Sequence, residues 1–156
     1  MKLSKEVKES LRFWQSYFSV WDGSCTISLS HGPCAKWDDY WYCDAACTPE
    51  AWGAGAWSTS LRQFMAIKWS NDEQEAARRK TASSSAFIEA LALVNATRAF
   101  GPQCQGKNVV IIVDAQDLSM AFQKGYAKDP ALHEQIVLAR TCALTWNLSL
   151  SCIQIY

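Results

Sequence analysis

The stretch Asn108-Val109-Val110-Ile111-Ile112-Val113-Asp114 decides the fold class. Five apolar residues in a row, all β-branched, predict a strand that other elements cover on both faces. In an α/β sheet, a side chain at the carboxyl end of such a strand reaches the crevice where ligands bind. Asp114 is therefore either a turn residue or one member of a site. The choice depends on whether other carboxylates reach the same place.

Length and composition describe one compact domain. The chain has 156 residues, of which 49% are hydrophobic, so it is globular rather than disordered. Its formal net charge is zero. This excludes the polycation expected of a strong, free-standing nucleic-acid binder, but it leaves room for a local basic groove.

The cysteines and the amino-terminal residues favour an intracellular protein, in the cytoplasm or nucleus. Residues 1–18 carry charges throughout, which leaves no apolar core of a secretory signal, and no run reaches membrane-spanning length. The seven cysteines are odd in number and scattered, so we expect free thiols. A zinc site at Cys25, Cys34, Cys43 and Cys47 is the alternative, although paired Cys-x-x-Cys spacings are missing.

Hydrophobic periodicity and turn residues predict the elements along the chain. Residues 70–84 are polar and predict a loop or a solvated helical turn. The other predicted elements, in chain order, are a helix over 4–21, a short edge strand at 25–29, strands over 39–45, 51–58 and 62–69, a helix over 85–100, the strand over 108–113, helices over 116–124 and 129–146, and a strand over 148–155.

This order predicts an α/β fold with a mixed five-stranded sheet, an antiparallel meander plus parallel strands, flanked by helices. Right-handed crossovers place the strand over 108–113 beside the first meander strand. Asp44 and Asp114 then end up on neighbouring strands, and Glu89 comes from the helix between them. Three carboxylates from three separate elements are thus expected to converge.

Short motifs surround these carboxylates. Asp44-Ala45-Ala46 is followed by Ala51-Trp52-Gly53-Ala54, and Glu89 opens Glu89-Ala90-Leu91-Ala92. Asp114 lies in Val113-Asp114-Ala115. Two further motifs lie away from the carboxylates: Lys124-Gly125-Tyr126-Ala127, and Leu11-Arg12-Phe13-Trp14 in the first predicted helix.

Together these motifs resemble the ribonuclease H-like domains of retroelement reverse transcriptases, especially the tyrosine-recombinase-type (DIRS-like) ones. The resemblance implies hydrolysis of the RNA strand of an RNA–DNA hybrid, with two Mg²⁺ or Mn²⁺ ions. By analogy Asp44 bridges both ions, and Glu89 and Asp114 complete the leaving-group side. The catalytic and metal-binding set is therefore expected to be Asp44, Glu89 and Asp114.

The chain departs from the family pattern at two points. Ala115 stands where the family has Asn, and the sequence stops at Tyr156, before the helix that carries the family's fourth acidic residue. Either the sequence is a trimmed domain or the protein has lost this ligand. We therefore expect residues 1–22 to form an amphipathic helix, and residues 23–156 to form a ribonuclease H-like domain that lacks its carboxyl-terminal helix.

Two other functions remain open. A degenerate domain would keep the fold and bind nucleic acid or a protein, such as a reverse transcriptase, through an aromatic surface. An integrase-like enzyme would need its Glu after the last strand, whereas Glu134 precedes that strand. If the chain binds nucleic acid, the candidate phosphate contacts are Arg78, Arg79, Lys80, Lys124 and Lys128. Each of them also has the simpler interpretation of a solvated surface charge.

Overall fold

The chain divides into two compact units, residues 1–35 and 36–156. The computed structural model describes residues 36–48, 52–80 and 85–155, except for the side chains at 73, 76, 79 and 80, and only scattered positions before residue 20. Among these, the Ser4 hydroxyl accepts the Val7 N–H at 3.3 Å, as an N-cap would. Most of the helix predicted over 4–21, all of the edge strand over 25–29 and the domain boundary at residue 22 lie outside the described residues.

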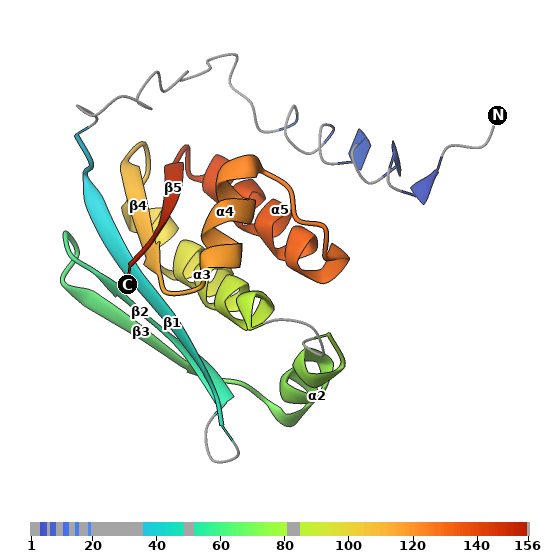
Figure 1. The fold of residues 1–156 in the computed structure, drawn as a ribbon. Coiled ribbons are helices and arrows are strands. Elements are labelled where there is room, and N and C mark those ends of the chain that lie inside the picture. The colour runs from blue at the N-terminus through green and yellow to red at the C-terminus, as the bar shows by residue number, and fades with distance from the viewer. Residues whose placement is uncertain are drawn as a thin grey trace. The chain divides into compact units, whose positions relative to one another are not determined.

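The second unit contains one sheet and its helices (Figure 1). In chain order these are β1 (Asp39–Cys47), β2 (Trp52–Ser58), β3 (Gln63–Lys68), α2 (Asn71–Lys80), α3 (Ala86–Phe100), the short 3-10 helix η1 (Gly101–Gln103), β4 (Asn108–Val113), α4 (Gln116–Lys124), α5 (Pro130–Thr145) and β5 (Ser149–Gln154).

The strand order β3-β2-β1-β4-β5 confirms the predicted mixed sheet of ribonuclease H-like type. β1, β2 and β3 pair antiparallel, because the connections between them are short. β4 and β5 run parallel to β1, and each is reached through a helical crossover. The chain therefore brings β4 beside β1, although more than sixty residues separate their starts.

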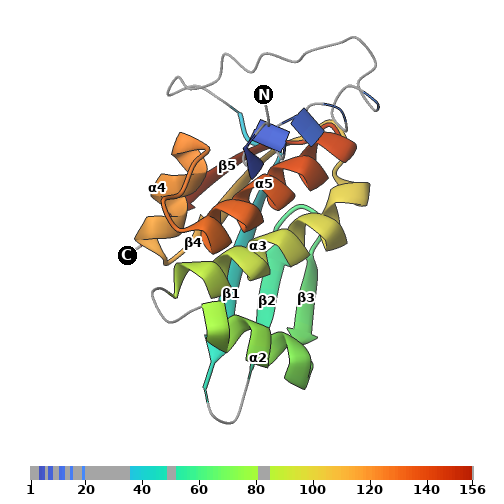
Figure 2. The ribbon, with the colours of Figure 1, turned by 90° about the vertical axis from the view of Figure 1, so that its right-hand side faces the viewer.

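The helices pack against one face of this sheet, as Figure 2 shows for α3 and α5. Val109, Ile111 and Val113 of β4 point into this core and are almost fully buried. Val110 and Ile112 alternate to the opposite face and are also buried. No helix among the described residues contributes to that face, but the strand is buried on both faces, as its sequence predicts.

The polar stretch after β3 is more ordered than its sequence predicts. Residues 71–80 form the ten-residue helix α2, rather than a loop or a single turn. Ala77 is 1% exposed and packs into the core, and the Gln74 side chain donates a hydrogen bond to the Trp69 carbonyl at 2.9 Å. The only apolar residues in this sequence are Ala76 and Ala77, which make no apolar stripe, so periodicity could not reveal this helix.

The described cysteines are Cys43, Cys47, Cys104, Cys142 and Cys152, and all are free thiols, as predicted. Two of the four cysteines in the alternative zinc site, Cys25 and Cys34, lie outside the described residues. Within the described part of the chain, the only group of side chains placed to hold a metal contains no cysteine. Nor is any helix there long and apolar enough to cross a membrane.

A buried carboxylate, Asp39, ties the start of β1 to the β2–β3 turn. Its oxygens accept hydrogen bonds from Trp41 Nε1 at 2.8 Å, from the Ser58 and Thr59 hydroxyls at 2.5 and 2.9 Å, and from the Ser60 N–H at 2.8 Å. Burial alone would raise the pKa of Asp39. The hydrogen bonds from Ser58, the Ser60 backbone and Trp41 outweigh it and hold that pKa well below its usual range.

Replacing Asp39 should therefore destabilise the fold. In Asp39→Ala the buried donors of Trp41 and Ser58 lose their acceptor, and we expect the free energy of unfolding to fall by about 3 kcal/mol in urea denaturation at pH 7. The loss should shrink below about pH 4, because a depressed pKa stabilises only where the unfolded carboxyl is ionised. Asp38→Ala is the control: Asp38 is exposed and accepts the Asn108 N–H at 2.8 Å. Equal losses in both variants would refute this role.

Candidate metal centre

The candidate site forms where two central strands stop pairing. β1 and β4 are in register from Asp39↔Val109 to Tyr42↔Ile112. Beyond Tyr42, β1 continues to Cys47 with β2 as its partner, while β4 ends at Val113. Glu89, in the first turn of α3, occupies the position beyond the end of this ladder. Each of the three elements therefore delivers one carboxylate to the same point.

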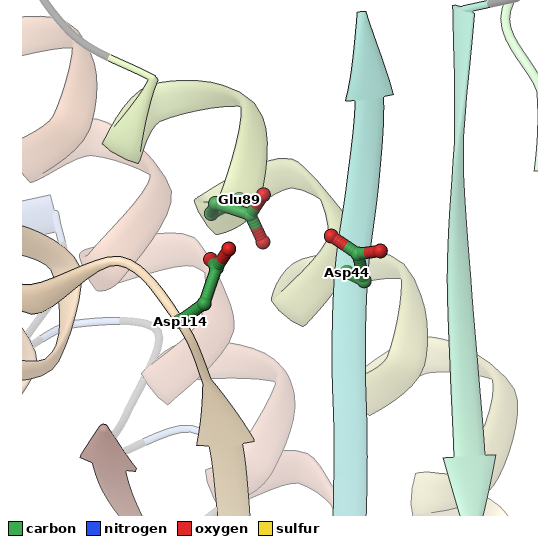
Figure 3. Close-up of side chains that lie close together, drawn as sticks. All are labelled: Asp44, Glu89 and Asp114. Atoms are coloured by element: carbon green, nitrogen blue, oxygen red, sulfur yellow. The ribbon is translucent and has the colours of Figure 1, made fainter. Parts of the chain in front are cut away.

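Asp44, Glu89 and Asp114 lie together, as Figure 3 shows. One carboxylate oxygen from each residue can be chosen so that all three atoms lie within 4.8 Å of one another. The sequence-based expectation that these carboxylates converge therefore agrees with the geometry.

The three carboxylates differ in their surroundings. Asp44 and Asp114 are exposed, whereas Glu89 is 6% exposed. The Ala45 N–H donates to Asp44 Oδ1 at 2.8 Å and to Glu89 Oε1 at 3.3 Å, so one backbone group orients two carboxylates. Glu89 Oε2 is buried and has no hydrogen-bond partner. A buried oxygen without a partner is costly unless a proton or a cation satisfies it.

This environment changes the acidity of Glu89. Burial, followed by the charges of Asp114 and Asp44, raises the pKa of Glu89 to about 7, and the hydrogen bond from Ala45 opposes this only partly. No basic side chain is among the causes of the shift. At neutral pH the chain therefore lowers the repulsion by holding a proton, and a cation would serve the same purpose.

The donor set fits a hard divalent cation. Mg²⁺ and Mn²⁺ prefer oxygen ligands, and Mg²⁺ is commonly bound through one or two carboxylates plus substrate phosphate. The unpartnered Glu89 Oε2 supplies a buried ligand atom, and the two exposed aspartates leave the other side of the site open to a substrate.

The predicted phosphate contacts are spread over the surface. Arg78 is exposed on α2, and its guanidinium lies 5.0 Å from the centre of the Trp52 ring. Lys124 ends α4, Lys128 lies in the connection to α5, and both are exposed. The side chains of Arg79 and Lys80 lie outside the described residues.

Two features beside the carboxylates are not among the sequence-based predictions. The first is the Ala45 N–H, which no sequence pattern identifies because it is a backbone group. The second is a hollow of about 550 Å³ beside Asp44, with Lys68 in its lining. The sequence signal for the hollow is the run of small residues in β2, because glycine and alanine leave space above the sheet.

Comparisons with known proteins do not assign the chain to a family. No family model matches the sequence, and no curated protein matches it. Among solved structures, RNase H1 from the halophilic archaeon Halobacterium salinarum NRC-1 is similar, with 15% identity over 75% of this chain and 84% of that one, and a TM-score of 0.49.

A second similar structure is the N-terminal RNase H domain of a Mycobacterium tuberculosis protein, solved as a fusion with maltose-binding protein. It has 12% identity over 77% of this chain and 83% of that one, and a TM-score of 0.49. Neither likeness bears on what this chain does. Its fold follows from its own strand order and register.

The raised pKa of Glu89 predicts a pH-dependent stability. A folded-state pKa of about 7, above the ordinary 4.5, means that Glu89 destabilises the metal-free fold increasingly as pH rises from about 4.5 to 7. In chelator, Glu89→Gln should therefore raise the free energy of unfolding by about 2 kcal/mol at pH 8 and by much less at pH 5. Urea denaturation followed by tryptophan fluorescence measures both values. An equal gain at both pH values, or in the exposed control Glu134→Gln, would contradict the assignment.

The helix α4 lacks a side-chain cap at its N-terminus, so a capping residue at position 115 should stabilise the fold. Ala115 occupies the N-cap of α4 with extended backbone angles (φ −74°, ψ 106°) and provides no side-chain cap. Ala115→Asn should restore a hydrogen bond to the first turn and raise the free energy of unfolding by about 1 kcal/mol, with Ala115→Ser giving a similar gain. Thermal unfolding measures both variants. A loss of stability in both would mean that this position does not act as the cap.

Proposed function

We propose that the chain is a metal-dependent nuclease that hydrolyses the RNA strand of an RNA–DNA hybrid. The observation that carries this proposal is the convergence of Asp44, Glu89 and Asp114, with a buried oxygen of Glu89 that lacks a partner. Purely structural carboxylates normally have their oxygens hydrogen-bonded, as Asp39 does here. A group with a buried unsatisfied oxygen beside two exposed carboxylates suits a cation site better than a structural one.

Asp44, Glu89 and Asp114 are the residues that would hold Mg²⁺ or Mn²⁺, with two ions in the active enzyme. When bound, such ions supply an activated water at neutral pH and stabilise the negative charge on the leaving oxygen. Glu89 would bind as the carboxylate, so its proton must leave first. Its pKa of about 7 makes this loss easy at slightly alkaline pH.

Backbone hydrogen bonds and strand pairing fix the positions of the three carboxylates before any ligand binds. The Ala45 N–H orients Asp44 and Glu89 together. Asp44 lies on a central strand paired on both sides up to Tyr42, which holds its position. Asp114 directly follows β4, whose backbone is fixed by β5 through the Ile155 N–H bonded to the Val113 carbonyl at 3.0 Å. Positions fixed in this way before substrate binds favour catalysis.

Substrate binding must then come from local charge, because the net charge is zero. Under this proposal Arg78, Arg79, Lys80, Lys124 and Lys128 contact the phosphate backbone on either side of the carboxylates. Contacts of this kind release counterions, so the affinity for hybrid should fall steeply with salt. Recognition of the RNA strand would use its 2′-hydroxyl groups.

A retroelement origin, from a DIRS-like reverse transcriptase acting inside the cell, is part of the same proposal. It is supported by the motifs around Asp44, Glu89 and Asp114, which lie on the strand, helix and strand end that the resemblance requires. The proposed division is an amphipathic helix over residues 1–22 and a ribonuclease H-like domain over residues 23–156.

The alternative is a catalytically degenerate domain that binds nucleic acid or protein. Two observations favour it. Ala115 replaces the family's Asn and leaves α4 uncapped directly after Asp114, and the chain carries no excess positive charge. The two functions differ in a single measurable property, the cutting of substrate.

Cleavage of a labelled RNA–DNA hybrid tests the nuclease. With Mg²⁺ or Mn²⁺ we expect cutting of the RNA strand, no cutting in chelator, and little cutting of double-stranded DNA or single-stranded RNA. Asp44→Asn, Glu89→Gln and Asp114→Asn should each lower the rate by about two orders of magnitude or more, because each removes a metal ligand. The rate should rise with pH between about 6 and 8 as Glu89 loses its proton.

Asp117→Asn is the matched control. Asp117 is an exposed carboxylate in the first turn of α4, three residues after Asp114 and outside the cluster, so its loss should leave the rate within about twofold. Cutting that survives chelator or Asp44→Asn would come from a contaminant. Hybrid binding without metal-dependent cutting would reject the nuclease in favour of the binding module.

A further inference from the structure

The face of the sheet opposite the helices carries a continuous row of large apolar side chains. Strand register places Phe64 opposite Trp57, Trp57 opposite Tyr42, Tyr42 opposite Ile112 and Ile112 opposite Ile153. One side chain from each of the five strands thus lies in a line across the sheet. We call this line the aromatic row, because its β3–β2–β1 end consists of rings.

The ring end of the aromatic row is exposed. Phe64 is 76% exposed, Tyr42 45% and Trp57 40%, whereas the aliphatic Ile112 is buried. Neighbouring strands lie about 4.8 Å apart, so the three rings make a strip about 10 Å across on a rigid surface. Contiguous exposed rings of this kind mark an interaction site rather than ordinary surface.

A hollow adjoins the aromatic row on the same face. One step further along β1, Asp44 is in register with Gly55, and Gly55 with Ala66. The next step on this face brings Ala46, opposite Gly53. Because these neighbours of Asp44 have small or no side chains, they leave a hollow of about 550 Å³, whose lining includes Asp44, Gly55 and Lys68.

We propose that this face binds an unpaired nucleic-acid strand, whose bases stack on Tyr42, Trp57 and Phe64 while its backbone lies in the hollow beside Asp44. Every nucleobase can stack on an aromatic ring, so a strip of exposed rings can bind a single strand of any sequence. Lys68 is among the residues that line the hollow, and its positive charge can neutralise a phosphate there. The link to cutting rests on the proposed nuclease: its substrate would be a hybrid that continues into an unpaired strand.

The continuity of the surface favours nucleic acid over a protein partner. Asp44 belongs both to the carboxylate cluster and to the lining of the hollow. It also shares a strand face with Tyr42, two residues earlier. A strand lying across the rings would therefore lead directly to the carboxylates. A protein docked on the rings need not occupy the hollow or contact Lys68, whereas a strand whose backbone lies in the hollow does both.

Binding measured without catalysis tests this inference. Fluorescence anisotropy of a labelled 12-nucleotide single-stranded RNA and of a blunt hybrid of the same sequence, in chelator and at low salt, compares the full chain with its variants. Trp57→Thr combined with Phe64→Thr removes two rings and puts β-branched residues, which favour strands, in their place. We expect it to weaken single-strand binding at least about tenfold, and hybrid binding by no more than about twofold.

Two further variants sharpen the result. Ile153→Thr removes an aliphatic residue from the same face, 40% exposed, and should leave single-strand affinity unchanged, because it offers no ring. Gly55→Val fills the hollow from a position where an added Cβ has its nearest neighbour, the Met65 carbonyl oxygen, at 3.8 Å. It should keep the fold, as circular dichroism would show, and weaken single-strand binding severalfold.

The outcomes separate this inference from the nuclease proposal. No single-strand binding, or equal binding by the double variant, overturns the inference even if the blunt hybrid is cut with Mg²⁺. Ring-dependent binding with no cutting of any hybrid supports the surface and rejects the nuclease. A double variant that changes the oligomeric state in light scattering but not the RNA affinity would show a protein contact, and would also overturn the inference.

Discussion

The parallel pairing of β1 with β4 is the constraint on which the rest of the structure depends. It joins an antiparallel meander to a strand that starts more than sixty residues later. It also stops at Tyr42 and Ile112, before either strand's last residue. Longer pairing would have satisfied the Ala45 N–H within the sheet. Because pairing stops, that N–H is available to Asp44 and Glu89, and two central strands present carboxylates at one point.

Asp39 and Glu89, the two carboxylates that are buried among the described residues, differ in what surrounds them. Asp39 and Glu89 are both almost inaccessible to solvent. Hydrogen bonds surround Asp39 and lower its pKa, so its negative charge stabilises the fold. Glu89 has one long hydrogen bond, two negative neighbours and a raised pKa, so its charge destabilises the metal-free fold. A cation bound beside these carboxylates would relieve this destabilisation.

The two faces of the sheet differ: one is covered by helices, and the other keeps large side chains exposed. Helices bury one face, with Val109 and Ile111 at its centre, and this supplies most of the apolar stabilisation. The other face keeps Trp57 and Phe64 exposed and carries the hollow beside Asp44. The carboxylate cluster lies where the strands diverge, and so it is supported by the first face and reached from the second. Rigidity and access are thereby provided by opposite sides of a single sheet.

The sequence by itself determined the five strands of the second unit, the helices α3, α4 and α5, their order along the chain and the three carboxylates. Runs such as 108–113 and the alternation around Tyr42 reflect local periodicity, and handedness rules then place β4 beside β1. Only the tertiary structure decided what is non-local. The helix at 71–80 contacts the core through the buried Ala77, and two of the hydrogen bonds of Asp39 come from donors about twenty residues away. Likewise, the acidity of Glu89 arises from burial and from charges on other strands, which no stretch of sequence contains.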